Sequence, residues 1–116
     1  MEKIVLVVPF AYEPLDLLRD FFKKKQMFLE KHNEVFMIFV NDKAMFDKSR
    51  DAIFYEIFGY NNTNAILLAN NKKMSIKAGA VYTGLGYALE NYTNIKKIGF
   101  VDVDNSIDIF SLISQC

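Results

Sequence analysis

The stretch KIVLVV, Lys3 to Val8, is a run of apolar and mostly β-branched side chains, and Pro9 follows it directly. A strand without polar alternation is typical of a parallel sheet that is covered on both faces. Proline donates no backbone hydrogen bond, so we expect Pro9 to end the strand. Three similar runs follow along the chain: VFMIFV at 35–40, AILLA at 65–69 and KIGFV at 97–101. The sequence therefore predicts four strands of a buried sheet.

Apolar side chains at helical spacing fill the three intervals between these runs. The intervals are residues 16–32, a stripe from Phe46 to Phe58 that Gly59 ends, and about 76–91, where Gly84 and Gly86 weaken the pattern. Strands that alternate with helices imply a parallel sheet with right-handed crossovers. We therefore predict an α/β, Rossmann-like fold, with a mostly parallel sheet and helices on both faces, as a single domain at residues 1–116.

The composition argues against several classes of protein. Lys+Arg and Asp+Glu both total 14, so no basic field favours nucleic acid as a partner. The one cysteine is the last residue, Cys116, which fits a reducing compartment. His32 is the one histidine, so a zinc site or a Cys–His nucleophile has no support. No apolar run reaches the ~20 residues that span a bilayer. We expect a cytoplasmic protein, either free or peripheral at the inner face of the membrane.

Polar residues follow each of the four predicted strands. These segments are Pro9–Glu13, Asn41–Asp42, Asn70–Lys72 and Asp102–Asp104, and three of the four carry a carboxylate. In open parallel sheets, ligands bind beyond the carboxyl ends of the strands. We therefore expect these side chains to meet at one edge of the sheet.

Asp102 and Asp104 are separated by one residue at the end of the fourth strand. In an extended chain such residues point to the same side, so both carboxylates are able to face one ligand. Carboxylate oxygens suit Mg²⁺ or Mn²⁺, which complete their coordination with water and substrate phosphate. The alternative is that Asp104, or the Asn-Ser pair after it, caps a helix that begins near Ile107.

Three other residues have a binding interpretation and a structural one. Asp42 either accepts a hydrogen bond from a bound base or sugar, or forms an Asx turn that leaves the second strand. Glu13 either faces a ligand or favours the N-terminus of the next helix. Lys77, at the start of the third helix, neutralises phosphate, lies over a base, or is a solvated surface lysine.

Four segments together resemble the N-terminal, nucleotide-sugar-binding half of family 2 glycosyltransferases of the GT-A fold. They are VPFAYE at 8–13, VNDKA at 40–44, KAGAVYTGL at 77–85 and DVD at 102–104. The family reads Val-Pro-x-Tyr-Asn-Glu, Val-Asp-Asp-Gly-Ser, Lys-Ala-Gly-Ala-Leu-Asn-x-Gly-Leu and Asp-Ala-Asp at the same points. The similarity runs in order through the whole chain, and its last two segments are the most specific.

The resemblance implies a role for each matching residue. Pro9 and Glu13 would line the nucleobase and ribose pocket, and Asp42 would accept from the uracil imide of a UDP-sugar. Lys77 would lie near the base or the diphosphate. Asp102 would approach the ribose or the sugar, and Asp104, with Asp102 beside it in the Asp-x-Asp motif, would ligate Mn²⁺ or Mg²⁺. The metal would stabilise the charge on the leaving diphosphate while the sugar passes to a carbohydrate or lipid-linked acceptor.

In this family the acceptor site and the general base lie in a second half, beyond the Asp-x-Asp motif. We therefore expect the domain to be incomplete at its carboxyl end, inactive in transfer on its own, and associated with a C-terminal half or with further copies of itself. The alternative function is a degenerate, non-catalytic GT-A-like interaction module, or one part of a split enzyme, that pairs through the apolar stretch Ile107–Ile113. A receiver domain also places carboxylates at strand ends, but it requires an acidic pair after the first strand.

Overall fold

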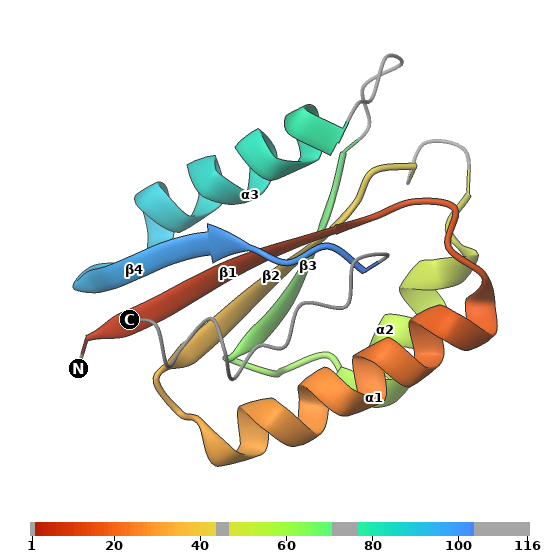
Figure 1. Cartoon of the computed structure of the whole chain (residues 1–116), viewed down its shortest axis with the longest axis horizontal. Coiled ribbons are helices and arrows are strands. Elements are labelled where there is room, and N and C mark those ends of the chain that lie inside the picture. Colours follow the sequence, from red (N-terminus) through yellow and green to blue (C-terminus); the bar gives the residue numbers. More distant parts are fainter. Residues whose placement is uncertain (1, 44–46, 71–76, 104–116) are drawn as a thin grey trace.

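The computed structural model describes residues 2–43, 47–70 and 77–103, with Lys77 and Ala78 described by their backbone alone. Strands and helices alternate through the described chain (Figure 1). In order, they are β1 Lys3–Phe10, α1 Leu15–Lys31, β2 Val35–Asn41, α2 Ser49–Phe58, β3 Ala65–Ala69, α3 Lys77–Asn91 and β4 Ile95–Phe100. The predicted order of elements is confirmed. Phe46, which the sequence placed at the start of the second helical stripe, lies outside the described residues.

The four strands form one sheet in the order β3-β2-β1-β4. All three pairings between described strands are parallel, and β1 pairs with β2 on one side and β4 on the other. The predicted α/β class with a parallel sheet is therefore confirmed, and the order matches the first four strands of the doubly wound arrangement.

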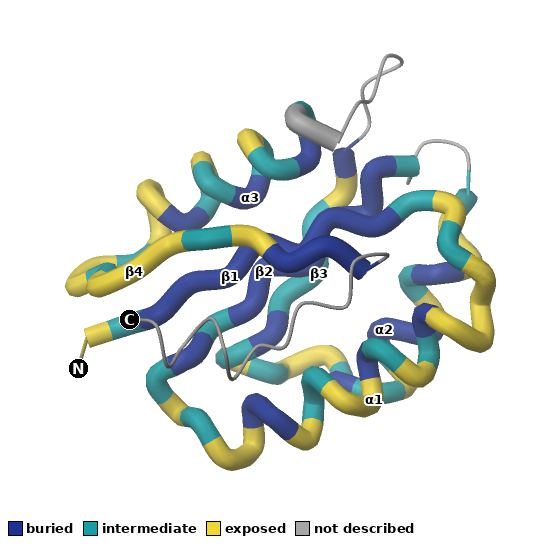
Figure 2. Tube along the Cα trace, viewed as in Figure 1, coloured by how far each residue is buried: buried dark blue, intermediate teal, exposed yellow. Residues whose placement is uncertain are grey.

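Helices cover both faces of the sheet, as expected. Figure 1 shows α1 and α2 on one face and α3 on the other, and Figure 2 shows the buried strands between these layers. Successive residues of β1 point to opposite faces, so Leu6 and Val8 belong to the core under α1 and α2, whereas Val5 and Val7 belong to the core under α3.

Phenylalanine rings fill the core under α1 and α2. Phe22 of α1 is fully buried, and its ring centroid lies 5.2 Å from that of Phe39 and 5.5 Å from that of Phe10. Phe54 and Phe58 of α2 lie 5.9 Å from the same ring. Edge-to-face contacts of this kind add to the burial of the rings, so Phe22 ties α1 and α2 to the sheet.

Small residues line the side of α3 that faces the sheet. Ala80 and Ala88 are fully buried. Gly84 lies midway between them, where an added Cβ would fall 2.4 Å from Cγ1 of Val7. Because four residues make about one helical turn, these positions form one stripe along which α3 approaches β1 and β2 closely.

Pro9 does not end the first strand, which continues to Phe10. The Ile4 N–H donates to the backbone oxygen of Glu34, just before β2, and the Phe10 oxygen accepts the backbone N–H of Asp42, just after β2. Even-numbered residues of β1 therefore bond toward β2. Lys3 donates to Asn94, and Val7 accepts from Val101, so odd-numbered residues bond toward β4. Pro9 therefore turns its missing N–H toward β4, which has already ended at Phe100.

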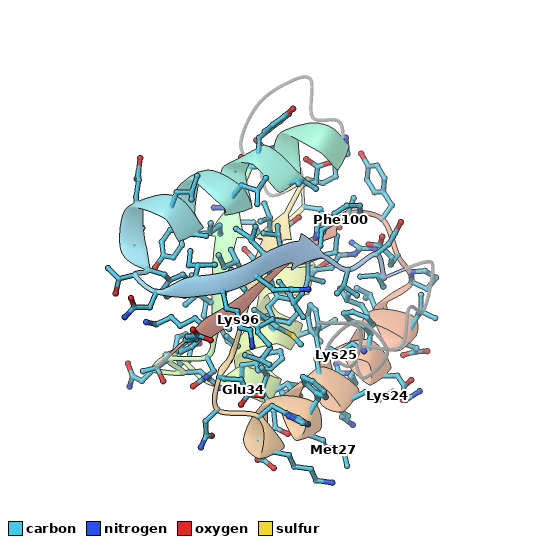
Figure 3. All side chains as sticks on the ribbon, turned by 60° about the vertical axis from the view of Figure 1, so that its left-hand side comes forward. Lys24, Lys25, Met27, Glu34, Lys96 and Phe100 are labelled. Carbon is cyan, nitrogen blue, oxygen red and sulfur yellow. The ribbon has the colours of Figure 1, made fainter. Side chains whose placement is uncertain are left out.

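The fourth strand spans Ile95–Phe100 rather than 97–101, and it is less buried than the sequence suggested. It lies at one edge of the described sheet, and α3 contacts β1 and β2 instead of covering it. Ile98 is 41% exposed and Phe100 is 53% exposed. Figure 3 looks onto this strand, with Lys96 and Phe100 labelled.

Candidate functional site

The carboxyl ends of all four strands lie at the same edge of the sheet, because every described pairing is parallel. From β1 the chain passes through α1 to β2 on one side, and it later returns through α3 to β4 on the other side. Such a reversal of strand order opens a crevice beyond the carboxyl ends of the two strands that flank it. In this protein these strands are β1 and β4.

Asp42 lies just beyond β2 and is buried together with Asn70, which lies just beyond β3. The Asn70 side-chain amide donates to Oδ1 of Asp42 at 2.8 Å. The Asp42 backbone N–H donates to Phe10 O at 2.8 Å, and the Asn70 N–H donates to Asn41 O at 3.0 Å. The Asp42 carboxylate is therefore held in a defined orientation by the ends of three strands.

The Asx turn that the sequence offered as an alternative role for Asp42 is formed by its neighbour. Oδ1 of the fully buried Asn41 accepts the Lys43 N–H at 3.0 Å. The Asn41 amide donates to Oδ1 of Asp51 at 2.9 Å, which ties the end of β2 to α2. Asn41 therefore makes this turn, and the Asp42 side chain accepts the Asn70 amide instead.

Arg50, in the first turn of α2, is a buried residue for which we predicted no role. Its Nε and one terminal nitrogen donate to the backbone oxygen of Glu13 at 3.1 and 2.7 Å, and its other nitrogen donates to Asp47 at 2.7 Å. Arg50 thereby fixes the loop after β1 against α2. A buried arginine must be paired, but its position within the predicted second helix carries no signal of this burial.

Asp47 and Glu13 shape the two loops that Arg50 joins. Hydrogen bonds from the Ser49 hydroxyl and the Ser49 N–H lower the pKa of Asp47 below its ordinary value; desolvation opposes them, and the nearby Arg50 charge adds to the lowering. Glu13 is half-buried and accepts the Ala11 N–H at 2.7 Å. The Glu13 side chain thus closes the turn after β1, a role that neither sequence interpretation included.

Pro9 lies in β1 and Asp102 lies just beyond β4, at the point where the strand order reverses. Both are buried, and Val101 N–H donates to Val7 O at 2.9 Å just before Asp102. Continuing the register in which Val7 pairs with Phe100 places Asp102 level with Pro9. Asp104, the second member of the predicted metal pair, lies outside the described residues. Residues 2–43, 47–70 and 77–103 hold no group of three or more His, Cys, Asp or Glu side chains suited to a metal.

The first turn of α3 lies beside the Asp42–Asn70 pair. An added Cβ on Gly79 would fall 3.6 Å from the Asn70 amide nitrogen, an ordinary van der Waals distance, so this turn lies next to the pair. Lys77 begins α3 here, although its side chain is outside the described part of the structure. The N-terminus of α3, where backbone N–H groups favour anions, is thereby brought to the carboxyl edge of the sheet.

The structure thus gathers Asp42 with the start of α3, and Pro9 with Asp102, along one edge. Comparison of the chain with protein-family models, curated proteins and solved structures found no match. Among the helices described, none combines the length and the apolar character required to cross a membrane.

Proposed function

We propose that this chain is a nucleotide-diphosphate-sugar-binding domain of the GT-A type, belonging to a metal-dependent glycosyltransferase of the family 2 kind. The observation that carries the proposal is the strand order β3-β2-β1-β4, which sets the crevice between β1 and β4 at the edge where Asp42, Asp102 and the start of α3 lie. Nucleotides bind at this position in doubly wound sheets.

The base and ribose are assigned to the ends of β1 and β2. Asn70 orients the Asp42 carboxylate through Oδ1. A carboxylate accepts hydrogen bonds at both oxygens, so Oδ2 is assigned to the imide N–H of uracil. Tyr12 is exposed and supplies an aromatic surface nearby. Nζ of Lys43 lies 5.2 Å from the centroid of its ring. UDP is therefore the favoured nucleotide.

The diphosphate is assigned to the start of α3 and to a divalent cation. Mn²⁺ and Mg²⁺ bind proteins through one or two carboxylates, so Asp102 together with Asp104 is a sufficient ligand set without a larger cluster. Asp102 is buried beside the crevice, which suits a carboxylate that faces a cation rather than bulk water. When bound, the cation would offset the negative charge of the leaving diphosphate.

Titration calorimetry with the full chain tests this assignment. UDP should bind in the presence of Mn²⁺, and Asp102→Asn or Asp104→Asn should weaken binding about tenfold or more, because each removes a charge from the cation site. Asp20→Asn is the matched control, since Asp20 lies on the exposed surface of α1 and pairs with Lys24. Failure of UDP, GDP, ADP and CDP to bind, with or without Mn²⁺, would refute the proposal.

A further inference from the structure

The two edges of the described sheet differ in how they are protected against pairing with another strand. The β4 edge carries Lys96 and Lys97, and its register with β1 is interrupted by a bulge. Charged side chains and bulges are the devices by which edge strands avoid association. The β3 edge, Ala65–Ala69, reads AILLA, with no charge, no proline and an unbroken register with β2.

The backbone groups of β3 point alternately toward β2 and away from the sheet. Met37 N–H donates to Asn64 O, and Asn70 N–H donates to Asn41 O, so even-numbered residues of β3 bond toward β2. In a parallel ladder the residues between them turn their N–H and C=O groups the other way. Leu67 and Ala69 therefore present backbone donors and acceptors at the outer edge, whereas the Ala65 N–H is held by the Asn62 side chain.

A groove of about 220 Å³ runs along this edge and is lined from both faces of the sheet. Tyr55 and Tyr60 border it on the α2 side, and Tyr87 borders it on the α3 side. The rings of Tyr55 and Tyr60 are stacked at 4.5 Å, and Tyr60 is 81% exposed. A strand added to β3 would bury side chains against these rings on alternate faces.

We propose that β3 pairs antiparallel with β3 of a second copy of this chain, about a two-fold axis near Leu67, to give one continuous sheet. Self-pairing is favoured over a charged partner because the strand carries no charge that would face itself. The chain has formal net charge +0, so two copies meet without net repulsion. A two-fold interface of this kind is the commonest way in which soluble proteins associate.

The geometry of the pair follows from the outward-facing residues. Leu67 would exchange two hydrogen bonds with its own counterpart, and Ala69 would lie opposite Ala65 of the partner subunit. The exposed Tyr60 of each copy would cover the junction. The β3 edge is the one farthest from β4 in the sheet order, so this inference does not depend on nucleotide binding in the crevice.

Sedimentation equilibrium of the full chain, over a concentration range from micromolar to millimolar, tests the proposal. The wild-type chain should show a dimer that dissociates on dilution. Ala69→Pro removes an outward N–H at an exposed position and leaves the bonds to β2 in place. Because the pair is symmetric, the dimer loses two hydrogen bonds, so its dissociation constant should rise about tenfold or more.

The matched control is Ile98→Pro on the opposite edge. Val101 N–H bonds to Val7, so odd-numbered residues of β4 face β1, and the Ile98 N–H faces outward in the same way as that of Ala69. This variant should dimerise like the wild type. A wild-type chain that stays monomeric at every concentration, or an Ala69→Pro variant that dimerises as strongly as the wild type, would overturn the proposal.

Hydrogen exchange of the wild type gives a second readout, which serves if circular dichroism shows that Ala69→Pro does not fold. The amides of Leu67 and Ala69 should exchange more slowly as the protein concentration rises, while the Ile98 amide should not change. Exchange at Leu67 and Ala69 that is independent of concentration would contradict pairing at this edge.

Discussion

The two faces of the sheet bury their strands in opposite ways. Under α1 and α2, four phenylalanine rings surround that of Phe22, and their bulk fills the space between helices and sheet. Under α3, a stripe of Ala80, Gly84 and Ala88 lets a single helix lie against β1. The first face gains stability from large apolar area, and the second gains it from close approach.

This difference predicts opposite responses to substitution. A face that is filled by large rings is vulnerable to loss of volume, because the remaining rings cannot collapse into the cavity. A face built on close approach is vulnerable to gain of volume, because neither the helix nor a buried strand has room to retreat. Substitutions on each face therefore test how the sheet is covered.

Phe22→Ala should give the largest effect. It removes the ring that contacts both helices and two strands, so we expect the free energy of unfolding to fall by about 3–5 kcal/mol. Urea denaturation measures the change. Phe21→Ala is the matched control, since Phe21 is only partly buried at the margin of the same cluster, and it should cost clearly less. Equal losses at the two positions would contradict a core centred on Phe22.

Gly84→Ala should be destabilising by about 1–3 kcal/mol, although alanine is the better helix former. The new Cβ would meet Val7, whose side chain is β-branched and fully buried and therefore unable to turn aside. Gly86→Ala, in the same helix, meets nothing within 4 Å and should be stabilising by about 0.5–1 kcal/mol. Thermal denaturation distinguishes the two, and a stabilising Gly84→Ala would show that α3 does not lie this close to β1.

The smallest predicted effect concerns alkaline pH. Burial, with a further contribution from Tyr87, raises the pKa of Tyr92 above its ordinary value near 10. As pH rises, the unfolded chain loses this proton first, so the contribution to stability is present below about pH 10 and is lost above it. The rings packed around Phe22 are phenylalanines and carry no such proton.

Tyr92→Phe should therefore reduce the loss of stability between about pH 9 and about pH 11, as measured by urea denaturation at each pH. Tyr60→Phe is the control, since its ring is largely exposed. If Tyr92→Phe and the wild type lose stability in parallel over this range, Tyr92 is not buried as described.

Hydrophobic patterning was sufficient to predict the order of elements and the parallel sheet, because each strand contains apolar residues in a row and each helix has an apolar stripe. It was not sufficient to separate Gly84 from Gly86, which look equivalent along the helix but differ in what lies opposite. Pro9 was wrongly expected to end β1, because the side on which its missing N–H falls depends on the register with β4, which no local pattern contains.

For the candidate site, the rule that parallel strands end at one edge was enough to expect Asp42 near the other strand ends. The partner of Asp42 was not predicted, since pairing with Asn70 requires the positions of β2 and β3 side by side. The role of Arg50 was not predicted, because its burial in α2 depends on the loop after β1 that it holds. The expected roles of Lys77 and Asp104 fall on side chains outside the described structure and stay predictions.

The position of β1 between β2 and β4 also affects when the described sheet is able to form. The Lys3 side chain donates to Thr93 O across 90 residues of chain, and β1 finds its second neighbour only in the last strand described. Closing so long a loop is entropically costly and slows folding. During synthesis, the first strand must therefore wait with one side unpaired until residues 95–100 have been made.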